Sequence, residues 1–137
     1  MEPTTNFSPD EFQCRHCQKH GIQQAFVDHL QRLRDAIRTP IEIISGYRCP
    51  KHPLEASKKH GPGLHSSGIA ADILVTALDP KSVYEIITRD FPEFRGIGAS
   101  RYRTTLHIDI RPVNARWAYD SKGKEVKWDG VWENLPA

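Results

Sequence analysis

Two histidines and one aspartate stand out by residue type and spacing. Asp72 follows His65 after a run of small residues and glycine, and His107 lies far downstream. Imidazole and carboxylate groups are both good zinc ligands, and a set of two histidines and one carboxylate leaves the fourth tetrahedral position open for water. Each histidine alone would be read as an ordinary surface or capping residue, but the combination predicts a catalytic zinc site formed by His65, Asp72 and His107.

The segment around His107 has the alternation of a β-strand. Leu106, Ile108 and Ile110 alternate with the polar residues His107 and Asp109, so one face of the strand is apolar and the other is reactive. We therefore expect the side chains of His107 and Asp109 to point the same way. Asp109 is predicted to act as the general base that takes a proton from the attacking water. The alternative is that Asp109 orients His107.

A second group of metal-binding side chains comes from the cysteines. Cys14 and Cys17 form a C-x-x-C pair, and Cys49 and His52 form a C-x-x-H pair. Together they provide four ligands, which is adequate for a closed structural zinc site. A disulfide between two of the three cysteines and three free thiols are the alternatives, and both stay open because the redox compartment is unknown. Three further histidines compete for the fourth ligand position: His16, His20 and His60.

Three motifs of this sequence together resemble a known family. Residues 45–48 read Ser-Gly-Tyr-Arg, and residues 63–72 read Gly-Leu-His-Ser-Ser-Gly-Ile-Ala-Ala-Asp, followed later by His107. This order resembles the zinc D-Ala-D-Ala carboxypeptidases and the phage endolysin peptidases, part of a wider group that includes lysostaphin and hedgehog. The resemblance covers roughly residues 7–117. The motif that contains His65 and Asp72 is specific, and the other two support it.

The resemblance implies a zinc peptidase that cuts peptidoglycan next to a D-amino acid, with the stem peptide as its partner. Arg48 would hold the carboxylate or carbonyl of the substrate, unless it is a surface arginine paired with a neighbouring acid. A D-Ala-D-Ala carboxypeptidase and an L-Ala-D-Glu endopeptidase are both compatible with the sequence. Two departures stand out: Gly63 replaces the usual serine, and Thr104 replaces an acidic residue. A zinc-containing binding module without activity and a zinc-ribbon-like interaction protein therefore remain alternatives.

The elements that must position these residues follow from periodicity and capping. Apolar residues at helical spacing predict a main helix over residues 22–38, and Asp79-Pro80 starts another helix that Phe91-Pro92 ends. Residues 50–63 are predicted to form a long loop beside the cleft. Strands are predicted over 41–45, 68–75, after Gly96, around His107, and on both sides of the turn at 120–124.

Composition bounds the class of protein. The chain has 137 residues, 38% hydrophobic and 26% charged, with a net charge of +2, which is typical of one globular domain. We expect an α+β fold with a small central antiparallel sheet and helices on one side, with a core over 7–117 and a C-terminal extension over 118–137. The low charge gives no reason to expect nucleic acid, and no apolar stretch is long enough for membrane insertion.

The amino terminus has no visible signal peptide. We therefore expect a monomer that is made in the cytoplasm and acts on the cell wall after release, as a phage or prophage lysis enzyme would.

Overall fold

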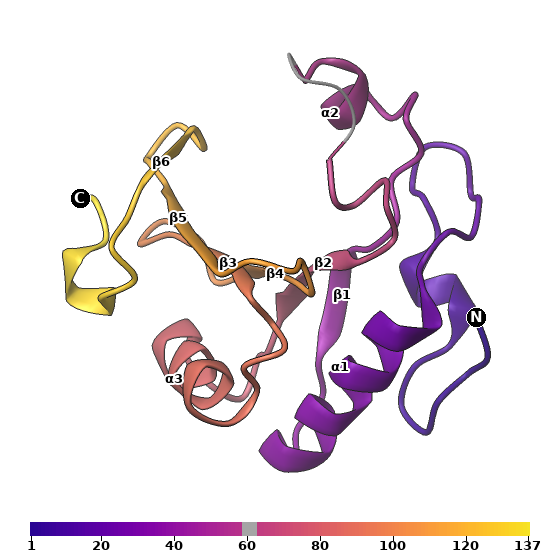
Figure 1. Cartoon of the computed structure of the whole chain (residues 1–137), viewed down its shortest axis with the longest axis horizontal. Coiled ribbons are helices and arrows are strands. Elements are labelled where there is room, and N and C mark those ends of the chain that lie inside the picture. The colour runs from indigo at the N-terminus through magenta and orange to yellow at the C-terminus, as the bar shows by residue number, and fades with distance from the viewer. Residues whose placement is uncertain (59–62) are drawn as a thin grey trace.

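A six-stranded sheet forms the centre of the computed structural model, which describes residues 1–58 and 63–137 (Figure 1). The strands lie in the order β1-β2-β4-β3-β5-β6. Their bounds are β1 Glu42–Ser45, β2 Ala70–Leu74, β3 Gly96–Ala99, β4 Leu106–Asp109, β5 Ala115–Tyr119 and β6 Glu125–Lys127. The α+β class with one central sheet, as the sequence predicts, is confirmed.

The strand pairing is mostly antiparallel, as expected, with one exception. β3 pairs with β5 in parallel, so the sheet is mixed. The reason is that β2 and β3 already occupy both edges of β4. The chain turns back after β4 and passes to the far edge of β3, where β5 runs in the same direction as β3.

Two helices cover one face of the sheet (Figure 1). They are α1 (Gln24–Ile37) and α3 (Pro80–Asp90), close to the predicted bounds. The carboxylate of Asp79 accepts a hydrogen bond from the backbone N–H of Ser82 at 2.9 Å, which caps α3. Seven apolar side chains of the two helices are buried against the sheet: Phe26, Val27, Leu30, Leu33, Val83, Tyr84 and Ile87. The prediction of helices on one side is confirmed for these two elements.

The region predicted as a long loop contains a short helix. α2 (Pro53–Ala56) lies above the sheet in Figure 1, away from α1 and α3. His52 precedes it, and its ring nitrogen Nδ1 accepts the backbone N–H of Leu54 at 3.1 Å. This capping contact and the proline at the first helical position explain why one helical turn forms where apolar periodicity is absent.

Both ends of the chain pack against the sheet domain. Near the amino terminus η1 (Pro9–Phe12) buries Phe12. At the carboxyl terminus, after η2 (Trp132–Asn134), the side chain of Leu135 is buried, as is that of Trp128. The predicted C-terminal extension therefore contributes to the same core. Within the described part of the chain, helices of the length and apolarity needed to span a bilayer are absent.

Candidate active site

The first two candidate metal ligands face each other on neighbouring strands. Asp72 on β2 lies opposite His107 on β4 in the antiparallel register, so both side chains project from the same face. Their apolar strand neighbours Ile73 and Ile108 belong to the core beneath. His107 Nδ1 lies 3.5 Å from Asp72 Oδ1. The side-chain alternation therefore puts the polar group on the side of the sheet opposite α1 and α3.

His65 reaches the same point from the turn before β2. Its Nδ1 lies 2.7 Å from the carbonyl oxygen of Gly46, to which it donates, and its Nε2 lies 3.7 Å from Asp72 Oδ1. The backbone N–H of Arg48 donates to the carbonyl of His65 at 3.2 Å. A hydrogen bond on one ring nitrogen fixes the tautomer and leaves the other nitrogen for a metal. The Ser-Gly-Tyr-Arg motif therefore holds His65 in position.

These three residues fit a zinc ion. Their ligand atoms all lie within 4.8 Å of one another, and both histidines are buried. Zinc with nitrogen and oxygen ligands at about 2.0–2.1 Å in a tetrahedron needs neighbouring ligands about 3.4 Å apart. The observed 3.5 and 3.7 Å separations from Asp72 Oδ1 are close to that value. The structure thus brings together the three residues that the sequence predicted, and the group can hold a metal ion.

Asp109 lies behind His107, on the side away from the ligand atoms. Its side chain is fully buried, and Oδ2 accepts from His107 Nε2 at 2.7 Å. Arg111 donates to both carboxylate oxygens, through Nε to Oδ1 at 2.8 Å and through Nη2 to Oδ2 at 2.7 Å. His107 and Asp109 do point the same way, but the imidazole separates the carboxylate from the metal position. In this placement Asp109 can orient His107, which is the alternative role; the base role stays a prediction.

Arg48 is held by carboxylates next to the ligand group. Its Nη2 donates to Asp72 Oδ2 at 3.0 Å and its Nη1 to Glu55 Oε2 at 3.4 Å, while Nε donates to Ser45 Oγ at 3.0 Å. The guanidinium thus donates to Oδ2 of Asp72, and the other oxygen, Oδ1, faces the two histidines. Arg48 also lines the pocket described below; it is paired with two neighbouring acids, and its substrate-binding role stays a prediction.

The charges of the site favour metal binding. Burial alone would raise the pKa of Asp72, but hydrogen bonds and charges from His107 and His65 hold it far below its usual range. Burial alone would lower the pKa of His107, but the hydrogen bonds to Asp109 and Asp72 raise it. The pKa of Asp109 is likewise lowered by Arg111 and His107 against the effect of burial. Both carboxylates are therefore ionised, which is the form in which Asp72 can bind a metal.

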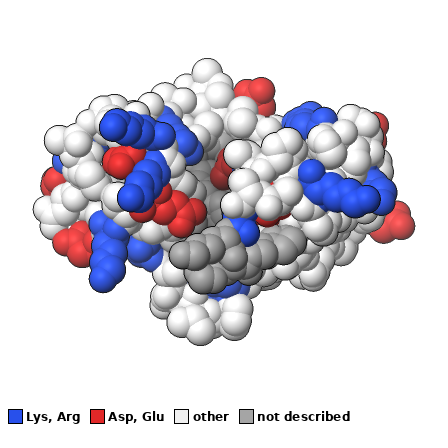
Figure 2. Space-filling view, turned by 90° about the horizontal axis from the view of Figure 1, so that it is seen from above, with Lys and Arg blue, Asp and Glu red and all other residues white. Residues whose placement is uncertain are grey.

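The candidate ligands open onto a pocket of about 560 Å³. Figure 2 looks onto this side of the molecule and shows its surface hollowed near the centre. Five cationic side chains line the pocket: Arg48, Lys58, Arg103, Arg111 and Arg116. Its lining carboxylates, among the described residues, are Asp72 and Glu125. The pocket therefore has an excess of positive charge and suits an anionic ligand.

Several of these lining residues were missed from the sequence. Trp117 lines the pocket, and its ring centroid lies 4.9 Å from that of His107. The Arg111 guanidinium lies 4.7 Å from the centroid of the Trp117 ring. Burial raises the pKa of Tyr119 to about 12, so its hydroxyl stays protonated. The alternation from His107 through Asp109 could have identified Arg111, whereas Trp117 and Tyr119 reach the pocket only because β5 pairs with β3.

The cysteines form a separate group. The sulfur atoms of Cys14, Cys17 and Cys49 all lie within 4.8 Å of one another. Burial raises the pKa of Cys14, but backbone N–H groups of Cys49, Cys17 and His16 lower it to about 7. His52, the predicted fourth ligand, instead uses Nδ1 to cap α2.

Comparison with known proteins agrees with this geometry. A family model described as Peptidase M15 matches residues 5–109, which is most of the chain. The matched span includes the three cysteines, Arg48, all three candidate metal ligands and Asp109. A search of the curated proteins finds no match. The match and the buried His-Asp-His group together show that this chain belongs to the M15 family of metallopeptidases.

Proposed function

We propose that the chain is a zinc-dependent peptidase that hydrolyses a bond next to a D-amino acid in peptidoglycan stem peptides. The observation that carries the proposal is the convergence of His65, Asp72 and His107 at the floor of an open pocket. A structural zinc site would be closed by a fourth protein ligand, whereas this one faces the pocket. Zinc held there would polarise the scissile carbonyl and activate a water molecule.

The neighbouring residues fix the ligands before substrate arrives. Gly46 accepts from His65 Nδ1, Asp109 accepts from His107 Nε2, and Arg48 holds the second oxygen of Asp72. Each of the three ligands is thus oriented by one contact outside the metal position, which is how catalytic metal sites keep their geometry.

We assign the proton acceptor to Glu125. Its side chain is exposed and lines the same pocket as the candidate ligands, and it forms no ion pair with any other residue of the described ranges. Asp109 is buried behind His107 and saturated with donors. Thr104 is exposed and lines a separate crevice beside Val83 and Leu106, so it is not near the reacting atoms. The role requires the Glu125 carboxylate to come within hydrogen-bond reach of the attacking water and the leaving amine when substrate is bound.

The positive pocket supports a substrate with carboxylates. Arg111 and Arg48 are neutralised by Asp109 and by Asp72, but Arg103 forms no ion pair within the described part of the chain. Its guanidinium lies 4.5 Å from the centroid of the Tyr119 ring, at the pocket. Stem peptides carry the carboxylates of D-Glu and of terminal D-Ala, which an arginine fork recognises. We propose that Arg103 binds one of them.

Digestion of purified peptidoglycan, with the products identified by mass spectrometry, tests the function. The wild type should release a specific set of muropeptides, and a chelator or His65→Ala should abolish it. The masses would distinguish removal of terminal D-Ala from cleavage at L-Ala-D-Glu. Absence of cleavage by a fully zinc-loaded wild type would refute the proposal and favour a binding module.

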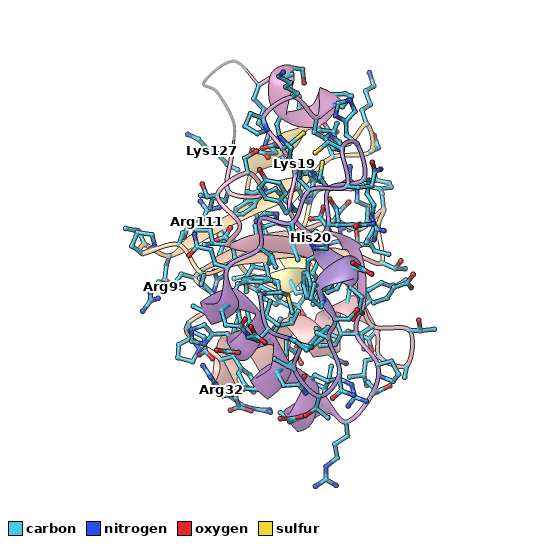
Figure 3. All side chains as sticks on the ribbon, turned by 90° about the vertical axis from the view of Figure 1, so that its right-hand side faces the viewer. Lys19, His20, Arg32, Arg95, Arg111 and Lys127 are labelled. Atoms are coloured by element: carbon cyan, nitrogen blue, oxygen red, sulfur yellow. The ribbon has the colours of Figure 1, made fainter. Side chains whose placement is uncertain are left out.

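Two further variants test the assigned roles. Glu125→Gln should lower kcat by about 10²- to 10⁴-fold without loss of bound zinc, and unchanged kcat would remove Glu125 as the proton acceptor. Arg103→Gln should raise KM for a substrate with a free carboxylate. Lys127→Gln is the matched control, because Lys127 is exposed on β6 and outside the pocket lining. Figure 3 labels its side chain, which points away from the ribbon.

A further inference from the structure

A second ligand cluster lies outside the catalytic pocket. The sulfur atoms of Cys14, Cys17 and Cys49 approach one another within 4.8 Å, and all three thiols are free. Cys14 and Cys49 are buried, and Cys17 is half-buried. Zinc bonded to sulfur at about 2.3 Å in a tetrahedron places sulfur atoms about 3.8 Å apart. Three thiols this close therefore need little movement to share one ion.

The backbone around Cys14 is folded to receive negative charge. The N–H of Cys49 donates to Cys14 Sγ at 3.3 Å. Gln18, the residue after Cys17, has a φ of 59°. A non-glycine residue in the left-handed region is uncommon and points to a local constraint. A backbone N–H that donates to a sulfur favours its thiolate, which is the form that binds a metal.

His16 is the histidine placed to complete the cluster. Its Nδ1 lies 3.7 Å from Cys49 Sγ, close to the roughly 3.6 Å expected between sulfur and nitrogen ligands on one tetrahedral zinc. The other histidines are engaged elsewhere. His52 uses Nδ1 to cap α2, and His20 Nε2 lies 3.6 Å from an oxygen of Asp10. His60, the remaining candidate from the sequence, lies outside the described residues.

We propose that Cys14, Cys17, Cys49 and His16 form a closed structural zinc site, distinct from the catalytic group. A disulfide would use two of these thiols and leave the third beside it with no partner, whereas one tetrahedral ion uses all three and the imidazole. Three sulfurs and one nitrogen with no open position are the ligands of structural rather than catalytic zinc.

The site would join two segments that are distant in sequence. Cys14 and Cys17 follow η1, and Cys49 directly follows the segment that holds His65. In Figure 3 sulfur atoms are seen beside the labelled Lys19, whose carbonyl accepts the N–H of Cys14 at 2.9 Å. The Tyr47 N–H donates to the Phe12 carbonyl at 2.9 Å, so the two segments are already in register. The ion would brace the catalytic group through its scaffold.

Zinc content of the full-length protein tests this inference independently of peptidase activity. The double variant His65→Ala/His107→Ala removes the catalytic site and should retain one zinc ion per chain, against two in the wild type. Adding Cys17→Ser should remove the remaining ion. His16→Asn in the same background should raise the zinc Kd at least tenfold. His52→Asn is the matched control, because asparagine can replace the capping acceptor, and its zinc Kd should be unchanged.

Cobalt substitution gives a readout that needs no cysteine variant. The folded double variant loaded with cobalt should show a thiolate-to-cobalt charge-transfer band and the visible absorption of a tetrahedral ion. Absence of this band, a mass two hydrogens lower from a disulfide, or zinc that persists after Cys17→Ser is added to the double variant would each overturn the inference. Absence of peptidase activity in the zinc-loaded wild type would refute only the proposed function and would leave this inference standing.

Discussion

Replacing Asp109 by asparagine separates the two roles that this carboxylate could have. Asp109 Oδ2 accepts from His107 Nε2 and from Arg111 Nη2, both at 2.7 Å, and Oδ1 accepts from Arg111 Nε at 2.8 Å. Asparagine has one acceptor oxygen in place of two. If its amide nitrogen faces His107, the imidazole must accept at Nε2 and carry its proton on Nδ1, which blocks the atom that faces Asp72. If its oxygen faces His107, the amide nitrogen of the new asparagine faces the N–H groups of Arg111, so two donors meet without an acceptor.

The size of the effect follows from these contacts. A hydrogen bond to a charged group is worth about 1.5–3 kcal/mol, so the loss should weaken zinc binding roughly 10- to 100-fold, the range found for contacts behind metal ligands. Competition with a chromophoric chelator measures the zinc Kd of Asp109→Asn. At saturating zinc, kcat should recover to within a few-fold of the wild type, because the ligands themselves are intact.

A control and an opposite outcome make this test decisive. Glu42→Gln removes an exposed carboxylate on β1 and should leave the zinc Kd unchanged. An Asp109→Asn protein with wild-type zinc affinity but a kcat lowered by about 10²-fold or more at saturating zinc would refute the orienting role and restore the base role.

Three other predictions concern the scaffold. Asp79→Ala removes the cap of α3 and should lower the midpoint of thermal unfolding by about 4 °C; an unchanged midpoint would contradict the capping role. In Gly46→Ala the new Cβ would lie 2.8 Å from the Cα of Phe12. We therefore expect the free energy of unfolding, measured with denaturant, to fall by about 1–3 kcal/mol, and zinc binding to weaken because His65 is displaced. Stability equal to the wild type would show that the segments can move apart. Burial lowers the pKa of His107, but its carboxylate neighbours raise it overall above 6.5. The protonated imidazole therefore stabilises the folded state. This contribution to the free energy of unfolding is complete below about pH 6.5 and is lost as the pH rises through the folded-state pKa. The metal-free protein should therefore show a falling thermal midpoint as the pH rises above 6.5, and a midpoint that rises instead would contradict the raised pKa.

The ligands of the site could be predicted because their signals are local. His65 and Asp72 lie in one short motif, and the alternation around His107 gives the side of the sheet on which it lies. The helices were predictable for the same reason, because the cap at Asp79 and the apolar stripe of α1 each depend on residues that are close together in the sequence. What these elements share is that the physical cause lies within about ten residues of the effect.

The role of Asp109 and the pocket wall were not predictable in this way. Alternation gives the face on which Asp109 lies but not which atoms stand between it and the metal position. That separation arises from the rotation of the His107 ring, with Nδ1 toward Asp72 and Nε2 toward Asp109. Tyr119 and Glu125 enter the pocket through the parallel pairing of β5 with β3, a long-range choice that no periodicity encodes.

The fourth cysteine-site ligand shows the same limit. The C-x-x-H spacing favoured His52, but one ring nitrogen of His52 is used by the first turn of α2. His16, one of the three competing histidines, lies inside the C-x-x-C pair, and only the fold of the loop brings its Nδ1 to 3.7 Å from Cys49 Sγ.

The direct opposition of Asp72 and His107 across β2 and β4 also bears on how the sheet assembles. Side chains alternate between faces with a period of two, so a shift of one residue between these strands would send one of the two ligands to the helix-covered face. Only the correct register can then bind the ion, and metal binding stabilises whichever state it selects. Zinc supplied during refolding should therefore favour chains in which β2 and β4 pair in the correct register. Chains that pair out of register would not gain the free energy of zinc binding.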